Sequence, residues 1–128
     1  MTEFLAGSNR MNFPQPPQLF AGSLEVTTNR RQVADNLKFQ QYEVIAIVAD
    51  KIVKFDPEGD DGSEVAAGII ANSVDTTTAT GVAGQWSGFY TGGDFNHAAL
   101  VWPAALTTLA QRRAVFATTA TIAISSVL

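Results

Sequence analysis

Five carboxylates lie close together in the segment 56–64, and they are the residues whose type best suits a metal ion: Asp56, Glu58, Asp60, Asp61 and Glu64. An EF-hand calcium loop needs acidic or amide residues at positions 1, 3 and 5, glycine at position 6 and glutamate at position 12. Counted from Asp56, the first three positions fit, but Asp61 occupies position 6 and Ala67 position 12. The spacing therefore favours a solvated turn, and we predict no metal site.

Nucleophilic or transition-metal chemistry would have to depend on His97, which is the only histidine. The chain has no cysteine, so thiolate zinc sites, disulfides and cysteine nucleophiles are excluded. No nucleophile-elbow sequence accompanies His97, and the glycines between residues 81 and 93 do not form a phosphate-binding loop followed by a helix. We predict no catalytic residue, no cofactor and no enzymatic activity.

The remaining residues of interest are suited to packing or association. Arg112 and Arg113 lie near the end of a predicted helix, where they complement its dipole and where either can pair with a carboxylate on a neighbouring chain. The tryptophan of the Trp102-Pro103 pair suits a core, but tryptophan is also enriched at interface hot spots. Phe116 ends this predicted helix, on the same face as Leu109 and Arg113. The candidates for an interface or core anchor are Trp102, Pro103, Arg113 and Phe116.

The distribution of charge predicts that part of the surface is covered by other chains. From Thr76 to Leu128 only Asp94, Arg112 and Arg113 are ionised, whereas the other 17 charged residues precede Thr76. A free-standing small domain usually keeps about a quarter to a third of its surface charged. We expect the carboxy-terminal half to lie against copies of the same chain and against a larger partner.

Composition limits the partners further. The net charge of −4, divided into +1 over residues 1–41 and −5 over residues 42–128, argues against nucleic acid, which requires a concentrated positive surface. The N-terminal sequence lacks a basic segment followed by an apolar run, so no signal peptide is predicted. No stretch is apolar enough to span a bilayer, so we predict no membrane partner either.

The chain is predicted to divide into an arm over residues 1–41 and a β-rich body over residues 42–128. Prolines at 14, 16 and 17 favour extended backbone in the arm, where apolar residues follow no regular period. A floppy terminus and a segment that becomes ordered on a partner both fit this composition. We favour the segment that becomes ordered, because solvating tails seldom carry three phenylalanines, and this arm has Phe4, Phe13 and Phe20 before position 21. Six apolar residues are predicted to contact a partner: Met11, Phe13, Leu19, Phe20, Leu24 and Val26.

Within the body, β-branched runs predict a tight hairpin formed by strands 42–49 and 51–55, with a turn at Asp50. Further strands are predicted at 65–71, 85–90 and 118–127, with a turn at Gly92-Gly93 and a Thr- and Gly-rich loop at 75–84. Thr107 or Thr108 is a suitable cap for a short helix that ends near Phe116.

Several of these segments resemble the phage lambda head decoration protein D family. The likeness covers about residues 42–128 and is carried by Lys51-Ile-Val-Lys-Phe-Asp56, Val65-Ala-Ala-Gly-Ile69, Leu100-Val-Trp-Pro103, Arg113-Ala-Val-Phe-Ala117 and the terminal Thr-Ala-Thr-Ile-Ala-Ile-Ser-Ser-Val127. The resemblance implies a mainly β fold, with a small β-clip or β-tulip-like body, one short helix and a long extended N-terminal arm.

The resemblance also implies a function. Family members are capsid-stabilising homotrimers that bind the major capsid protein on the outer surface of the expanded head, so the protein would be located in the virion after synthesis in the host cytoplasm. Trp102, Pro103, Arg113 and Phe116 then become candidates for the trimer interface. An alternative is a tail or host-attachment module that binds glycans, in which Trp86, Phe89 and Tyr90 would stack on sugars.

Overall fold

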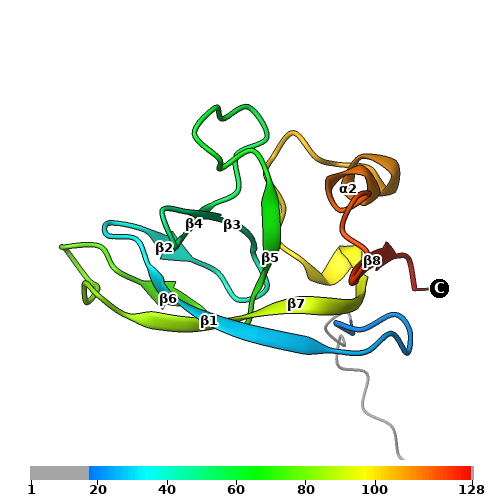
Figure 1. Ribbon diagram of the computed structural model, residues 1–128, viewed down its shortest axis with the longest axis horizontal. Helices are drawn as coiled ribbons and strands as arrows, with labels where there is room; N and C mark the ends of the chain where they lie inside the picture. Colours follow the sequence, from blue (N-terminus) through cyan, green and yellow to red (C-terminus); the bar gives the residue numbers. More distant parts are fainter. Residues whose placement is uncertain (1–17, 128) are drawn as a thin grey trace, which may run out of the picture.

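Five strands close into a small barrel, as seen in a computed structural model that describes residues 18–127 (Figure 1). Around the barrel each strand pairs with the next in the order β1-β4-β3-β5-β7, and pairing between β1 and β7 completes the ring. The longest edge is the antiparallel pair β1–β7, which runs along the bottom of the view. The strands are β1 (Thr27–Val33), β3 (Val44–Val48), β4 (Lys51–Lys54), β5 (Ala66–Ile70) and β7 (Trp86–Asn96).

The β3–β4 hairpin forms as the sequence predicts, and its turn consists of two residues, Ala49 and Asp50. Both have positive φ, 52° and 65° respectively. Two consecutive residues of this kind are the signature of a type I′ turn, whose twist matches that of the flanking strands. Alanine is a poor residue for this conformation, because its Cβ crowds the following carbonyl group.

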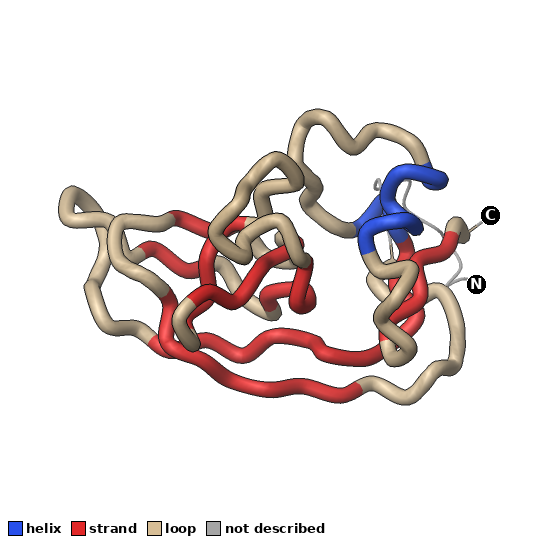
Figure 2. The backbone as a smooth tube through the Cα atoms, turned by 45° about the horizontal axis from the view of Figure 1, so that its top comes forward, coloured by secondary structure: helices blue, strands red, loops and turns tan. Residues whose placement is uncertain are grey.

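The remaining elements extend the barrel at its two ends. At one end β2 (Lys38–Phe39) and β6 (Val74–Asp75) form a separate two-stranded sheet. At the other end β8 (Ile122–Ser125) pairs in parallel with the last residues of β7, and helix α2 (Leu109–Val115) lies against it. The 3₁₀ turn η1 (His97–Ala99) follows β7 directly. The view in Figure 2 also shows both helical segments gathered at the β8 end.

Helix α2 begins where the sequence predicts. The Thr108 hydroxyl accepts a hydrogen bond from the Gln111 N–H at 3.2 Å, and the Gln111 side chain accepts one from the Thr108 N–H at 3.1 Å. This reciprocal capping box satisfies two backbone donors that have no partner inside a helix. The helix is only seven residues long, so its position depends on such caps and on its contacts with β8.

Two apolar cores lie on opposite faces of the shared strands. One fills the barrel and consists of Val33, Phe39, Ile45, Ile52, Ile70, Val74 and Phe89. The other lies beneath α2 and β8 and consists of Val44, Phe55, Ala66, Ile69, Phe95, Leu100, Phe116, Ile122 and Ile124. Neighbours such as Val44 and Ile45 belong to different cores, because successive strand residues point to opposite faces. The mainly β class with one short helix is confirmed.

Two sequence predictions differ from the structure. Thr27–Val33, which fall within the predicted arm, form a strand of the barrel, so the body includes this part of the chain. Gly92 and Gly93, predicted as a turn, instead continue β7 to Asn96. Gly93 has a φ of 143°, and a Cβ on Gly92 would overlap the Thr27 hydroxyl, so the two glycines permit a distorted strand rather than ending it.

Candidate functional site: a binding surface at the α2 and β8 end

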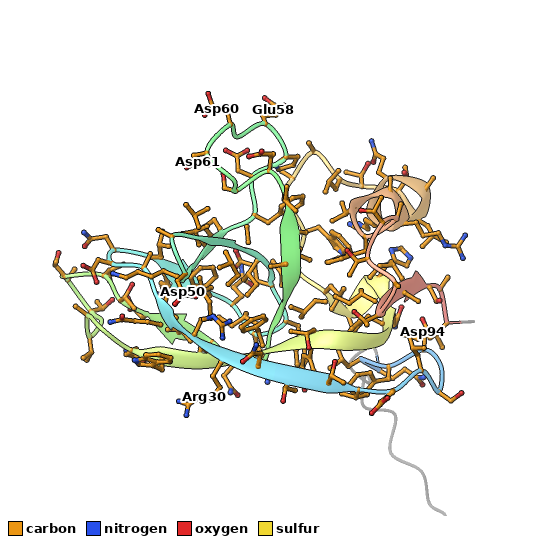
Figure 3. All side chains as sticks on the ribbon, viewed as in Figure 1. Arg30, Asp50, Glu58, Asp60, Asp61 and Asp94 are labelled. Carbon is orange, nitrogen blue, oxygen red and sulfur yellow. The ribbon has the colours of Figure 1, made fainter. Side chains whose placement is uncertain are left out.

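The acidic loop does not assemble a metal site. Figure 3 shows Glu58, Asp60 and Asp61 on the loop that projects from the barrel. Asp61 Oδ1 accepts hydrogen bonds from the Ser63 hydroxyl at 2.6 Å and from the Ser63 N–H at 3.1 Å, and these bonds lower the pKa of the Asp61 carboxyl. Glu64 likewise accepts from the Gly62 N–H at 2.8 Å. Within residues 18–127, no group of three or more His, Cys, Asp or Glu is placed to hold a metal ion.

His97 links the 3₁₀ turn η1 to helix α2 and to the Trp102 loop. Its Nδ1 accepts a hydrogen bond from Arg112 Nη1 at 2.9 Å, and its carbonyl oxygen accepts from Trp102 Nε1 at 2.9 Å. Arg112 also donates to the Leu106 carbonyl and lies over the Trp102 ring, 5.5 Å from its centre. Partial burial, with the neighbouring Arg112 charge, lowers the pKa of His97. All of these contacts join η1, the Trp102 loop and α2.

The three aromatic residues suggested for glycan stacking do not share a surface. Phe89 is buried in the barrel core, and Tyr90 packs against Phe20 and Phe95 in an aromatic cluster. Burial raises the pKa of the Tyr90 hydroxyl. Trp86 alone is exposed, with 57% of its surface accessible. A flat aromatic platform is therefore not formed by these residues.

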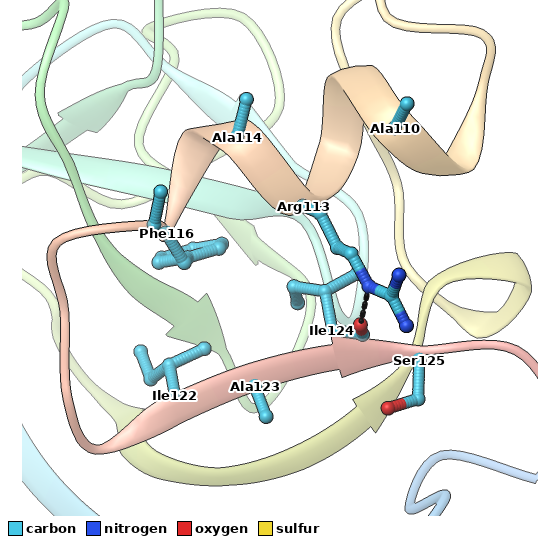
Figure 4. Close-up of a pocket in the computed structure, with 9 residues that line it drawn as sticks. Ala110, Arg113, Ala114, Phe116, Ile122, Ala123, Ile124 and Ser125 are labelled. Carbon is cyan, nitrogen blue, oxygen red and sulfur yellow. Dashed lines mark hydrogen bonds between the residues drawn. The ribbon is translucent and has the colours of Figure 1, made fainter.

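An open apolar groove lies between α2 and β8, with a volume of about 610 Å³ (Figure 4). Its helical side carries alanines and Arg113, its other side is β8, and Phe116 closes one end. The alanines on α2 leave the groove wide, and Arg113 is the α2 side chain that reaches across to β8. The lining residues are Ala110, Arg113, Ala114, Phe116, Ala117, Ile122, Ala123, Ile124 and Ser125.

Arg113 is the one ionised residue among the described residues that line this groove. Its Nε donates to the Ile124 carbonyl oxygen at 3.1 Å, as the dashed line in Figure 4 shows. Unlike Arg112, Arg113 has no carboxylate, histidine or aromatic partner among the described residues, whose ion pairs are Arg31–Asp50 and Lys54–Glu43. Its terminal nitrogens therefore retain the capacity to bind a carboxylate.

Strand β8 ends the sheet, and its outer edge faces the groove. The Gly93 N–H donates to the Thr121 carbonyl, so alternate residues of β8 point their peptide groups toward β7. The peptide groups of Ile122 and Ile124 consequently point away from β7, which agrees with the bond from Arg113 to Ile124. This edge is partly satisfied within the chain, because the Ile122 N–H donates to the Thr119 carbonyl at 3.3 Å and the Ile124 carbonyl accepts from Arg113.

The other three interface or core-anchor candidates lie beneath or beside α2. Phe116 is 3% exposed and belongs to the core, with its ring 6.3 Å from that of Trp102. Trp102 is half-buried and packs against the same core, while Pro103 is half-buried beside it. The structure therefore brings Trp102, Pro103 and Phe116 to the end of the molecule that carries the groove.

The arm candidates separate into two groups. Leu19 and Phe20 pack on the chain's own body: the Asn96 N–H donates to the Leu19 carbonyl at 2.8 Å, and the Phe20 ring contacts Tyr90 and Phe95. Leu24 and Val26 are 43% and 46% exposed. Met11 and Phe13 lie outside the described residues.

The exposed segment Leu24–Val26 lies next to the start of β8. Gly92 lies between the two segments: a Cβ atom at this position would collide with the Thr27 hydroxyl and would lie 3.3 Å from the carbonyl oxygens of Glu25 and Thr121. A shallow depression lined by Leu24, Glu25, Thr27, Ala120 and Thr121 marks the same junction. The exposed segment and the groove thus flank β8 at one end of the molecule. Sequence reasoning selected Leu24 and Val26 but missed Glu25, since no local pattern distinguishes it from an ordinary surface acid.

This arrangement is suited to binding. The end of the molecule bearing α2 and β8 combines an apolar groove with the exposed apolar side chains of Leu24 and Val26. Among residues 18–127, no helix is long and apolar enough to cross a membrane.

Comparison with known families supports a binding role. Residues 18–124 match the family of the bacteriophage lambda head decoration protein D. The chain belongs to this family. The match begins at Gln18, so it includes strand β1 and extends further toward the N-terminus than the resemblance seen in the sequence. No relative was found among the curated proteins.

Membership of this family gives the groove and the exposed Leu24–Val26 segment a functional context, which is contact with other proteins of the phage capsid. Head decoration is a structural role on the phage capsid, so the protein is a component of the virion and its partner is the capsid. The groove and the exposed Leu24–Val26 segment are then candidates for contact with the capsid or with other copies of the chain.

Proposed function

We propose that the protein binds as a homotrimer to the outer surface of the expanded phage head and stabilises the head against the pressure of its DNA. The observation that carries this proposal is the α2 and β8 end, where an apolar groove and the exposed Leu24 and Val26 lie together on a member of a head decoration family. Water-exposed apolar surface of this kind is typical of a site of association.

The major capsid protein is the proposed partner, and synthesis takes place in the host cytoplasm. Within the arm, the proposed capsid contacts are Met11 and Phe13. Leu19 and Phe20 have a different role, because they already pack against Phe95 and Tyr90 of the same chain and anchor the segment that follows the arm.

Co-sedimentation with purified heads tests this proposal. The protein is mixed with expanded and with unexpanded shells that lack it, and the bound fraction is measured across a range of concentrations. Binding to the expanded shell alone is the expected result, since expansion creates the surface that is recognised. Equal binding to both forms, or to neither, contradicts the proposal. A variant in which Met11 and Phe13 are both replaced by serine should bind more weakly while remaining folded.

A further inference from the structure

We infer that the groove between α2 and β8 is filled by the Leu24–Val26 segment of a neighbouring copy of this chain, with Glu25 of that copy paired with Arg113. This inference rests on the proposed homotrimer and names the surfaces that would form it. The second copy is the chosen occupant because the chain itself carries a segment whose polarity complements the groove.

The complementarity has an apolar part and a charged part. Within residues 18–127, the groove is lined by alanines, Phe116, two isoleucines and Ser125, and Arg113 is the only ionised residue among them. The segment presents two exposed aliphatic side chains, Leu24 and Val26, on either side of a single exposed carboxylate, Glu25. Apolar surface would thus meet apolar surface, and one carboxylate would meet one guanidinium group.

Glu25 and Arg113 are both exposed, so each is accessible to a partner on another copy of the chain. The ion pairs within residues 18–127 are Arg31–Asp50 and Lys54–Glu43, and neither involves these two residues. Arg113 uses Nε for the Ile124 carbonyl, so its two terminal nitrogens can form the paired hydrogen bonds that a carboxylate accepts.

The positions of the two surfaces suit a closed ring. The segment and the groove are different patches, so the contact is heterologous, with the segment of one copy entering the groove of the next. Both patches flank β8 at the same end of the molecule, since Leu24 and Glu25 share a depression with Ala120 and Thr121 at the start of that strand. Neighbouring patches at one end allow successive copies to surround a common axis.

Charge reversal tests the pairing. Glu25→Arg and Arg113→Glu are made singly and together, and assembly is followed by analytical ultracentrifugation at micromolar concentration. Each single reversal should raise the dissociation constant of the trimer by about tenfold or more, because like charges then face each other across each contact. The double reversal should recover assembly to within about threefold of the unaltered protein. Glu58→Arg, the same change on the distant acidic loop, should leave assembly unchanged.

Two outcomes overturn the inference: single reversals that assemble like the unaltered protein, or a double reversal no better than the singles. An unaltered protein that is monomeric contradicts the homotrimer itself, whereas a trimer insensitive to the reversals contradicts only this assignment.

Cysteine cross-linking provides a second readout that does not depend on charge. The chain has no native cysteine, so Leu24→Cys and Ala114→Cys proteins can be mixed and oxidised cleanly. A disulfide between chains at positions 24 and 114 is expected, and mass spectrometry identifies it. Ser73→Cys, an exposed position outside both patches, serves as the matched partner. A yield for 24–114 no higher than for 24–73 overturns the inference.

Discussion

At the scale of single residues, Asp75 shows how one carboxylate organises a loop. Its side chain accepts hydrogen bonds from the Thr77 N–H at 2.9 Å, from the Thr77 hydroxyl at 2.6 Å and from the Thr80 hydroxyl. These bonds, first those from Thr77 and Thr80, lower the pKa of Asp75 to about 2. The largely uncharged loop 76–84 is therefore tied to β6 through this residue.

The lowered pKa of Asp75 predicts a loss of stability in acid. A carboxyl group whose pKa is lower in the folded state stabilises that state above its unfolded value, here 3.8, and this contribution disappears as the pH falls toward about 2. The midpoint of urea unfolding, measured from pH 5 to pH 2, should fall more steeply for the unaltered protein than for Asp75→Asn. Identical slopes for the two proteins would contradict this role.

The positive φ of the turn residue Ala49 predicts that replacing it with asparagine increases stability. Its φ of 52° is costly for alanine and is more favourable for asparagine, which type I′ turns prefer at this position. Ala49→Asn should therefore raise the free energy of unfolding by about 0.5–1 kcal/mol. Ala105→Asn, at an exposed turn residue without positive φ, is the control and should give no gain. A loss of stability in Ala49→Asn would show that the turn has a different geometry in solution.

At the scale of elements, the sequence predicted the segments whose signals are local. The β3–β4 hairpin follows from its β-branched runs, and helix α2 follows from the cap predicted at Thr107 or Thr108, of which the structure uses Thr108. Strand β1 was missed because Thr27–Val33 is mostly polar and carries no alternation of apolar residues. It is a strand because β7 and β4 supply hydrogen-bonding partners from distant parts of the chain.

Individual residues of the candidate site could be selected from the sequence, but the groove that they line could not. Trp102, Arg113 and Phe116 were selected from residue type, and the structure places all three around α2. The groove itself was not predictable, because it depends on the parallel pairing of β8 with β7 and on alanines that carry no sequence signal. Glu25 was missed for the same reason, since its position beside β8 depends on the close approach that Gly92 permits.

The helix cap predicts that replacing Thr108 lowers the stability of the fold more than replacing the adjacent Thr107. Thr108→Ala removes the acceptor of the Gln111 N–H and should lower the free energy of unfolding by about 1 kcal/mol. Thr107→Ala is a close control, because the Thr107 hydroxyl makes only a 3.5 Å contact with Gln111, and it should change stability by less than about 0.5 kcal/mol. Chemical denaturation of both variants measures the difference. Equal effects would contradict the capping role of Thr108.

At the scale of the whole molecule, the groove lies in the ion-poor carboxy-terminal half, and both features suit a surface that other chains cover. A surface with few charges is tolerated where other chains cover it, and the proposed homotrimer would bring three capsid-binding surfaces together. Avidity of this kind lets individually weak contacts hold a protein on a shell for long periods.

Avidity predicts that trimerisation and head binding are linked. A folded variant that remains monomeric should bind expanded heads about a hundredfold or more weakly than the trimer, because its contacts can no longer act together. Binding curves for the two proteins on the same shells measure this ratio. A monomer that binds as tightly as the trimer would mean that each subunit holds the shell independently.

Release of DNA from filled heads tests the central claim most directly. Heads prepared without this protein are heated with and without the purified chain, and the temperature at which DNA escapes is recorded. Stabilisation against internal pressure predicts a higher release temperature when the protein is bound at saturation. Release at the same temperature in both samples, with the protein demonstrably bound, would contradict the proposal that it stabilises the head.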